Sequence, residues 1–122
     1  MSERISEAER AVMEVLWDKA PLTASDIAGR VEPERKWSLA TVKTLLSRLT
    51  QKQAVSYEED GRRFLYSPVL QRDDHALTES TRLMDSLFGG RISPLVAHLA
   101  DNEKLDDADI AELEALIRKL KS

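Results

Sequence analysis

The chain has 122 residues and no cysteine, which excludes disulfides, thiolate metal sites and thiol nucleophiles. It contains no 18-residue apolar run, and its N-terminus lacks the apolar stretch of a secretory signal, so we expect a cytoplasmic protein without a membrane span. The net charge of −4 hides an asymmetry, because residues 35–63 carry 7 basic and 3 acidic side chains while the segments on either side are each net acidic. Such a basic segment indicates either an anionic partner or a solvated basic face.

Two short helices are predicted at the N-terminal end. The first should begin at Ser6, since Ser6 and Glu9 have the spacing of a capping box in which each side chain bonds the other's backbone amide. The second should begin at Thr23, with Asp26 three residues later, and Pro33 should end it.

The segment 37–52, "WSLATVKTLLSRLTQK", predicts a third helix with two different faces. Ser38 is the expected N-cap. The apolar face comprises Val42, Leu45, Leu46 and Leu49. The opposite face and its flanks carry short, hydroxylated or basic side chains: Ala40, Thr41, Lys43, Thr44, Ser47, Arg48 and Gln51.

After this helix the pattern changes to alternation. In "AVSYEEDGRRFLYSP", apolar and aromatic residues alternate on both sides of Asp60-Gly61, a dipeptide favoured in tight turns. We therefore expect a β-hairpin with Arg62 and Arg63 immediately after its turn.

The second half of the chain reads as helical. Helices are expected over 70–87, from Ser93-Pro94 with Pro94 at the first helical position, and from near Asp106 to the C-terminal end. We place the domain boundary so that residues 1–70 form one domain and residues 71–122 form a helical second domain.

Three helices followed by a two-stranded hairpin are the elements of a winged helix. The expected fold is therefore mainly α with a small β-hairpin: an N-terminal winged helix-turn-helix plus a C-terminal helical dimerisation region. A helix that enters the major groove needs short side chains near the base edges and cations or hydroxyls near the phosphates. The predicted DNA contacts are Trp37, Ser38, Ala40, Thr41, Lys43, Thr44, Ser47, Arg48, Arg62 and Arg63.

The C-terminal helices carry apolar stripes that about 50 residues cannot bury alone. Pairing across a two-fold axis would cover them, and packing onto the chain's own winged helix is the alternative. The predicted dimer contacts are Leu83, Leu87, Leu95, Leu99, Ile110, Leu113, Leu116, Ile117 and Leu120.

Several segments also resemble the penicillinase-repressor family of BlaI/MecI/CopY-type winged-helix repressors. They are "ISEAERAVMEVLW", "TASDIAGRV", "WSLATVKTLLSRLTQK", "GRRFLYSPV" and "LDDADIAELEALI". The resemblance implies a homodimeric repressor that binds a palindromic operator and uses its C-terminal helices as the dimer interface. Two departures are Arg10, where the family often has tryptophan, and Gln53, which replaces a glycine common after the third helix.

The resemblance also bears on how repression ends. Some family members are cut within the C-terminal half, at an Asn–Phe bond, after a membrane-anchored sensor protease is triggered. By alignment that bond falls at His98–Leu99, where the residue types differ. The copper-responsive branch uses a Cys-x-Cys site, which a chain without cysteine cannot build. No metal and no other cofactor is expected.

Three other functions are alternatives to a repressor. An enzyme is disfavoured, because His75 and His98 are the only histidines and no phosphate-binding or nucleophile motif occurs. A protein-interaction module without DNA affinity would use the acidic C-terminal helices. A DNA-binding protein with a small-molecule effector would need a pocket, for which an aromatic content of 5% gives little indication.

Overall fold

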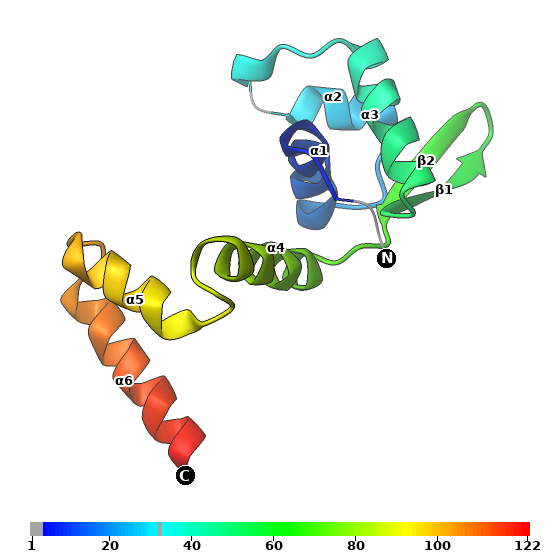
Figure 1. Ribbon diagram of the computed structural model, residues 1–122. Helices are drawn as coiled ribbons and strands as arrows, with labels where there is room; N and C mark the ends of the chain where they lie inside the picture. The colour runs from blue at the N-terminus through cyan, green and yellow to red at the C-terminus, as the bar shows by residue number, and fades with distance from the viewer. Residues whose placement is uncertain (1–3, 32) are drawn as a thin grey trace. The chain divides into compact units, whose positions relative to one another are not determined.

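The computed structural model describes residues 4–31 and 33–122 and divides the chain into two compact units, the first ending at Ala76 and the second beginning at Leu77. The first unit has the winged-helix order of three helices and a hairpin (Figure 1). Its elements are α1 (Glu7–Asp18), α2 (Ala24–Arg30), the 3-10 turn η1 (Pro33–Arg35), α3 (Leu39–Gln51), β1 (Val55–Asp60) and β2 (Arg63–Pro68). The mainly helical fold class and the winged helix predicted from the sequence are therefore confirmed.

The first two helices begin where local chemistry predicts. Ser6 Oγ accepts a hydrogen bond from the Glu9 amide at 3.1 Å, and the Ser6 amide donates to Glu9 Oε1 at 2.9 Å. Thr23 and Asp26 form the same reciprocal pair, with distances of 3.1 and 3.2 Å. Each pair satisfies two amides that the first helical turn leaves without partners, which explains why these starts are legible in the sequence.

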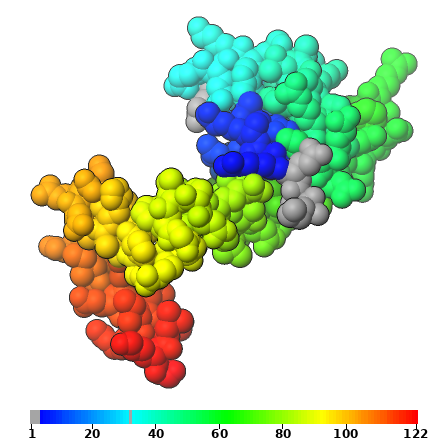
Figure 2. Space-filling model, in the orientation of Figure 1, coloured from blue at the N-terminus to red at the C-terminus, as the bar shows by residue number. Residues whose placement is uncertain are grey.

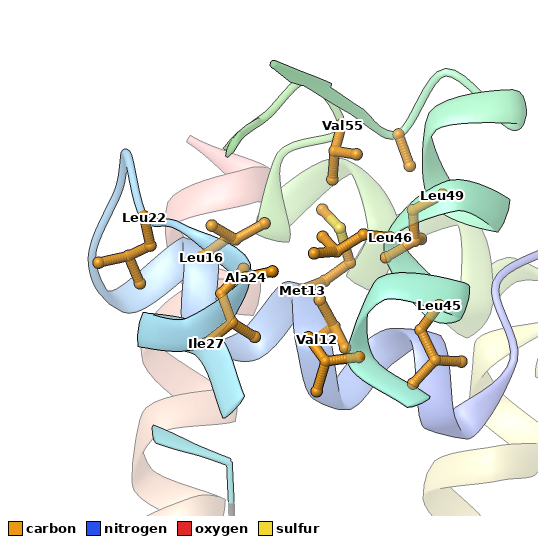
Figure 3. Packing of buried hydrophobic residues seen from close by; sticks show 12 residues of the cluster. Val12, Met13, Leu16, Leu22, Ala24, Ile27, Leu45, Leu46, Leu49 and Val55 are labelled. Atoms are coloured by element: carbon orange, nitrogen blue, oxygen red, sulfur yellow. The ribbon is translucent and has the colours of Figure 1, made fainter. Parts of the chain in front are cut away.

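A single apolar core holds the first unit together. Figure 3 shows α1, α2 and α3 directing their apolar side chains into it. The buried apolar residues are Val12, Met13, Leu16, Leu22, Ala24, Ile27, Val42, Leu45, Leu46, Leu49, Ala54 and Val55. The four residues predicted as the apolar face of α3 are all among them. This face therefore anchors α3 in the core, and the opposite, polar face of the helix stays exposed.

The hairpin is confirmed, but its turn lies one residue later than predicted. Asp60 pairs with Arg63 as the last residues of the two strands, so the two-residue turn is Gly61-Arg62. Gly61 has a φ of +67°, a left-handed conformation that glycine adopts without steric cost. Arg62 therefore lies in the turn itself, and Arg63 opens β2.

The base of the hairpin is tied to the helices by non-local hydrogen bonds. Leu22 and Tyr66 exchange both backbone bonds, at 3.0 and 2.8 Å, which attaches β2 to the segment before α2. Trp17 Nε1 donates to the Leu70 carbonyl at 2.8 Å, and the Trp17 ring contacts buried His75. These contacts explain why the first unit continues to Ala76.

The helices after the hairpin are α4 (Arg72–Leu87), α5 (Ile92–Asp101) and α6 (Asp107–Lys121), of which α4 crosses the boundary between the units. The last helix starts where predicted, near Asp106, and Asp106 is its N-cap, accepting a hydrogen bond from the Asp109 amide at 2.8 Å. The start predicted for the preceding helix was wrong by two residues, because α5 begins at Ile92 and Pro94 is its third residue. Proline fits there because the first-turn amides have no intrahelical acceptor.

Most of the predicted dimer contacts are exposed in the single chain. Leu83, Leu87, Ile110, Leu116, Ile117 and Leu120 are exposed, whereas Leu95, Leu99 and Leu113 are half-buried. Neither α5 nor α6 contains a buried residue. The second unit thus leaves apolar surface without an intramolecular cover.

Candidate nucleic-acid interface

The outer face of α3, defined here by Ser38, Ala40, Thr41, Lys43, Thr44, Ser47 and Arg48, is exposed along its whole length. Two of its hydroxyls bond locally, so their side chains stay close to the helix. Ser38 Oγ accepts from the Thr41 amide at 3.2 Å, and Thr44 Oγ1 donates to the Ala40 carbonyl at 3.0 Å. The middle of the face therefore carries short side chains, and the longer side chains of Lys43 and Arg48 lie at its edges.

Trp37 differs from the other predicted contacts because it is half-buried and packs against the core. It immediately precedes the Ser38 cap, so it fixes the start of α3 while exposing part of its ring.

A hollow of about 220 Å³ lies beside α3 on the same side as the hairpin. It brings together three predicted cationic contacts, Lys43, Arg62 and Arg63, from α3 and the hairpin. The rest of its lining is Thr23, Ala24, Ser25, Leu39, Phe64 and Tyr66. Figure 2 shows the hairpin projecting as a finger beyond the helices of the first unit. Arg48 does not line this hollow and stands further along α3.

The cations around the hollow are not equally available. Arg63 is held by Asp60 through two hydrogen bonds, from Nε at 3.0 Å and from Nη2 at 2.8 Å. Hydrogen bonds from the Thr23 backbone and side chain hold the pKa of Asp26 below its usual value against the effect of burial, and the charges of Arg30 and Arg63 act in the same direction. Arg63 is therefore shared with carboxylates, and Arg62 and Lys43 are the cations best placed to meet an anion.

The far end of α3 is anchored by a buried ion pair. Lys52 Nζ lies 2.6 Å from Glu9 Oε1 and donates to the Arg4 carbonyl at 2.9 Å. Burial raises the pKa of Glu9, but the hydrogen bond from Lys52, those from Ser6 and the Lys52 charge together lower it below the ordinary value. Glu9 thus stays ionised and ties the end of α3 to the start of α1.

Some lining residues of the hollow were not singled out from the sequence. The sequence pattern identifies Thr23 only as a helix start and places Phe64 and Tyr66 only in the hairpin, and it gives Ser25 and Leu39 no role. Their approach depends on the Leu22–Tyr66 pairing and on the packing of α2 against α3, which no local pattern encodes. The hydroxyl-rich run Thr23-Ala24-Ser25 was the one available signal.

Two kinds of feature, a metal-binding cluster and a membrane-spanning helix, are absent from the part of the chain that the structure describes. Residues 4–31 and 33–122 contain no cluster of three or more metal-ligating side chains. None of the described helices has the length and apolar composition needed to cross a bilayer.

Comparison with known proteins identifies the family. A family model described as penicillinase repressor matches residues 5–119. The chain belongs to the penicillinase repressor family. It is accordingly a DNA-binding transcriptional regulator and not an enzyme, and the family resemblance read from its sequence is confirmed.

Relatives within the penicillinase repressor family match over nearly the whole chain. The penicillinase repressor of Bacillus licheniformis is 27% identical over 119 residues, covering 98% of this chain and 93% of the relative. Among solved structures, the DNA-binding domain of the repressor BlaI matches 61% of this chain and 93% of its own, with 32% identity and a TM-score of 0.53. The monomeric form of B. licheniformis BlaI in complex with the blaP half-operator matches 61% of this chain and 90% of its own, with 31% identity and a TM-score of 0.51.

Proposed function

We propose that this protein is a homodimeric transcriptional repressor that binds a palindromic operator, with α3 in the major groove and the hairpin on the phosphate backbone. The observation that carries the proposal is the outer face of α3, which is exposed, low in its middle and bounded by cations. A groove about 12 Å wide admits a helix only when the side chains facing the bases are short. The opposite face of α3 is buried in the core through Val42, Leu45, Leu46 and Leu49, so the outer face is the side of the helix that is open to a partner.

The length and position of each side chain determine whether it would contact bases or phosphates. Ala40, Thr41 and Thr44 can approach base edges, and their methyl groups suit contact with thymine methyls. Lys43 and Arg48 can reach phosphates or guanine edges. Arg62, at the turn of the hairpin, is placed for the backbone and supplies affinity without sequence preference.

The homodimer is proposed from the exposed apolar residues of α4, α5 and α6. With no buried residue in α5 or α6, the second unit lacks an intramolecular core of its own. A two-fold interface covers the same patch on both copies and sets two α3 helices about one DNA turn, roughly 34–36 Å, or a multiple of it apart. We therefore assign residues 1–70 to DNA binding and residues 71–122 to dimerisation, in a protein that acts in the cytoplasm.

We propose further that repression ends when the chain is cut at the aligned bond, His98–Leu99, after a sensor protease is triggered. This bond lies near the end of α5, and the His98 carbonyl accepts a hydrogen bond from Asn102 Nδ2 at 2.9 Å. A protease that binds extended backbone could cut it only after the last turn of α5 unwinds, which is a local opening. Cleavage there would detach α6 from the rest of the proposed dimer interface.

The experiment that tests the proposal is enrichment of DNA from a random-sequence duplex pool by the intact protein. We expect a two-fold-symmetric sequence to be enriched. Lys43→Ala and Arg48→Ala should each weaken binding to it by about five- to one-hundred-fold while leaving the thermal transition unchanged, because both side chains are exposed. Enrichment of no sequence, together with binding of a protein partner, would favour the interaction module instead.

A further inference from the structure

An arginine outside the proposed DNA contacts stacks on the segment that leads into α3. The Arg35 guanidinium lies 5.0 Å from the centre of the Trp37 ring, and its Nη2 lies 3.3 Å from Glu7 Oε1. Glu7 is in the first turn of α1, so the contact joins the start of α1 to the segment that precedes α3. The Arg35 side chain is only 24% exposed, whereas that of Glu7 is 75% exposed.

The backbone of this segment needs such a restraint. Between η1 and α3, Lys36 has a φ of +47°, a left-handed conformation that lysine adopts only at a steric cost. A residue held in such a region persists where its surroundings determine it. The neighbours of Lys36 on either side, Arg35 and Trp37, are the two partners of the stack.

The position of Trp37 affects the residues of α3 that are proposed to contact DNA. Trp37 precedes the Ser38 cap directly, and Ser38 Oγ lies 3.1 Å from Thr41 Oγ1 as well as accepting from the Thr41 amide. In helix-turn-helix proteins the N-terminal residues of the recognition helix contact the base edges. A shift of Trp37 would therefore move the part of α3 that reads sequence.

We infer that Arg35 is a positioning residue for sequence-specific binding: its guanidinium, held by Glu7, clamps the Trp37 ring and so fixes the start of α3 against the bases. The inference rests on the proposed function and deepens it. Arg35 acts through the planar, fork-shaped group that an arginine offers and a lysine lacks. Its role is distinct from that of a phosphate contact, for which a positive charge alone suffices.

The test compares Arg35→Ala and Arg35→Lys on two duplexes, the sequence enriched by the wild-type protein and a scrambled version of it, over a range of salt concentrations. Positioning predicts that both variants lose about three- to ten-fold in affinity for the enriched duplex, the range that one cation–π contact supplies, with little change on the scrambled duplex. The slope of log affinity against log salt should stay at the wild-type value. Arg10→Ala, at an exposed arginine on α1, is the matched control for loss of charge.

A phosphate contact predicts a different set of results and would overturn the inference. Arg35→Ala would then weaken both duplexes alike and reduce the salt slope by about 1, and Arg35→Lys would restore both quantities. Unchanged binding of the enriched duplex by Arg35→Ala would overturn it as well.

A second readout reports the clamp without DNA. In protein labelled with 5-fluorotryptophan, Arg35→Ala and Arg35→Lys should shift the ¹⁹F resonance of Trp37 and leave that of Trp17 in place, which also shows that the fold is kept. An unmoved Trp37 resonance overturns the inference. If the wild-type protein enriches no duplex, the proposed function fails, and the ¹⁹F comparison still decides whether Arg35 holds Trp37.

Discussion

At the scale of single residues, the buried Glu9–Lys52 ion pair links two helices of the first unit. Glu9 is 2% exposed, and its Oε1 receives both the Lys52 ammonium and the Ser6 amide. The pair joins α1 to the end of α3, and so couples the fold to the helix proposed to read DNA. A buried charge that loses its partner costs far more than an exposed pair contributes.

Replacing Lys52 with methionine should lower the free energy of unfolding at pH 7 by about 3–5 kcal/mol, because it leaves the Glu9 carboxylate buried without its cation. Urea denaturation measures this. Arg10→Ala, which removes an exposed pair with Glu14, should change the free energy by less than about 1 kcal/mol and serves as the control. Equal effects of the two substitutions would show that the Glu9 pair has no special weight.

The same pair predicts a dependence on pH. Since the pKa of Glu9 is lower in the folded protein than its ordinary value of 4.5, its ionisation stabilises the fold above that value. The contribution is lost as the pH falls through the folded-state pKa. Between pH 7 and pH 3, Glu9→Gln should therefore lose less stability than the wild type in urea titrations. A parallel loss in both proteins would mean that Glu9 is not a source of acid sensitivity.

At the scale of elements, features that depend on neighbouring residues could be predicted from the sequence, and features that depend on distant residues could not. The caps at Ser6, Thr23 and Ser38 were predicted correctly because each bond spans three residues. The hairpin turn was misplaced by one residue because its register depends on pairing with the opposite strand. The hollow beside α3 was not foreseen, since segments far apart in the chain meet there only through the core.

The end of α3 offers a stability test. Gln53 has a φ of +62° just after the helix, where the family commonly has glycine. Gln53→Gly should raise the free energy of unfolding by about 1 kcal/mol, because glycine adopts this conformation without a clash between its Cβ and the backbone. Gln51→Gly, at a helical position two residues earlier, should instead lower it. Thermal or urea unfolding of the two variants should therefore give shifts of opposite sign; shifts of the same sign would contradict the account.

The hairpin turn offers a binding test. Arg62→Ala should reduce affinity for enriched and scrambled duplexes by similar factors, with a salt slope reduced by about 1, because a phosphate contact carries no sequence information. Glu58→Ala, on the same hairpin, is an exposed control of opposite charge that should not weaken binding. A loss confined to the enriched duplex would make Arg62 a base-reading residue.

At the scale of the whole molecule, we propose that the second unit pairs two copies of the chain and so brings together two DNA-binding first units. Leu116 and Leu120 are 56% and 83% exposed in the single chain, so they contribute little to its own packing. Helical spacing in the sequence predicts the apolar stripe of α6 to which they belong. Neither that spacing nor the structure of a single chain identifies the surface that covers the stripe.

Leu116→Asp combined with Leu120→Asp should convert the proposed dimer into a folded monomer by sedimentation equilibrium, because two charges on each copy would be brought together in an apolar interface. Glu114→Ala is the control on the same helix and should remain dimeric. Persistence of a dimer in the double variant would place the interface on another surface.

The central claim, that the outer face of α3 enters duplex DNA, is tested most directly by the salt dependence of binding to the enriched duplex between about 50 and 200 mM salt. We predict a steep loss of affinity for the wild type, with a slope that falls by about 1 in Lys43→Ala and again in the variant that also carries Arg48→Ala. Wild-type affinity and slope in both variants would contradict the claim and place the DNA on another surface.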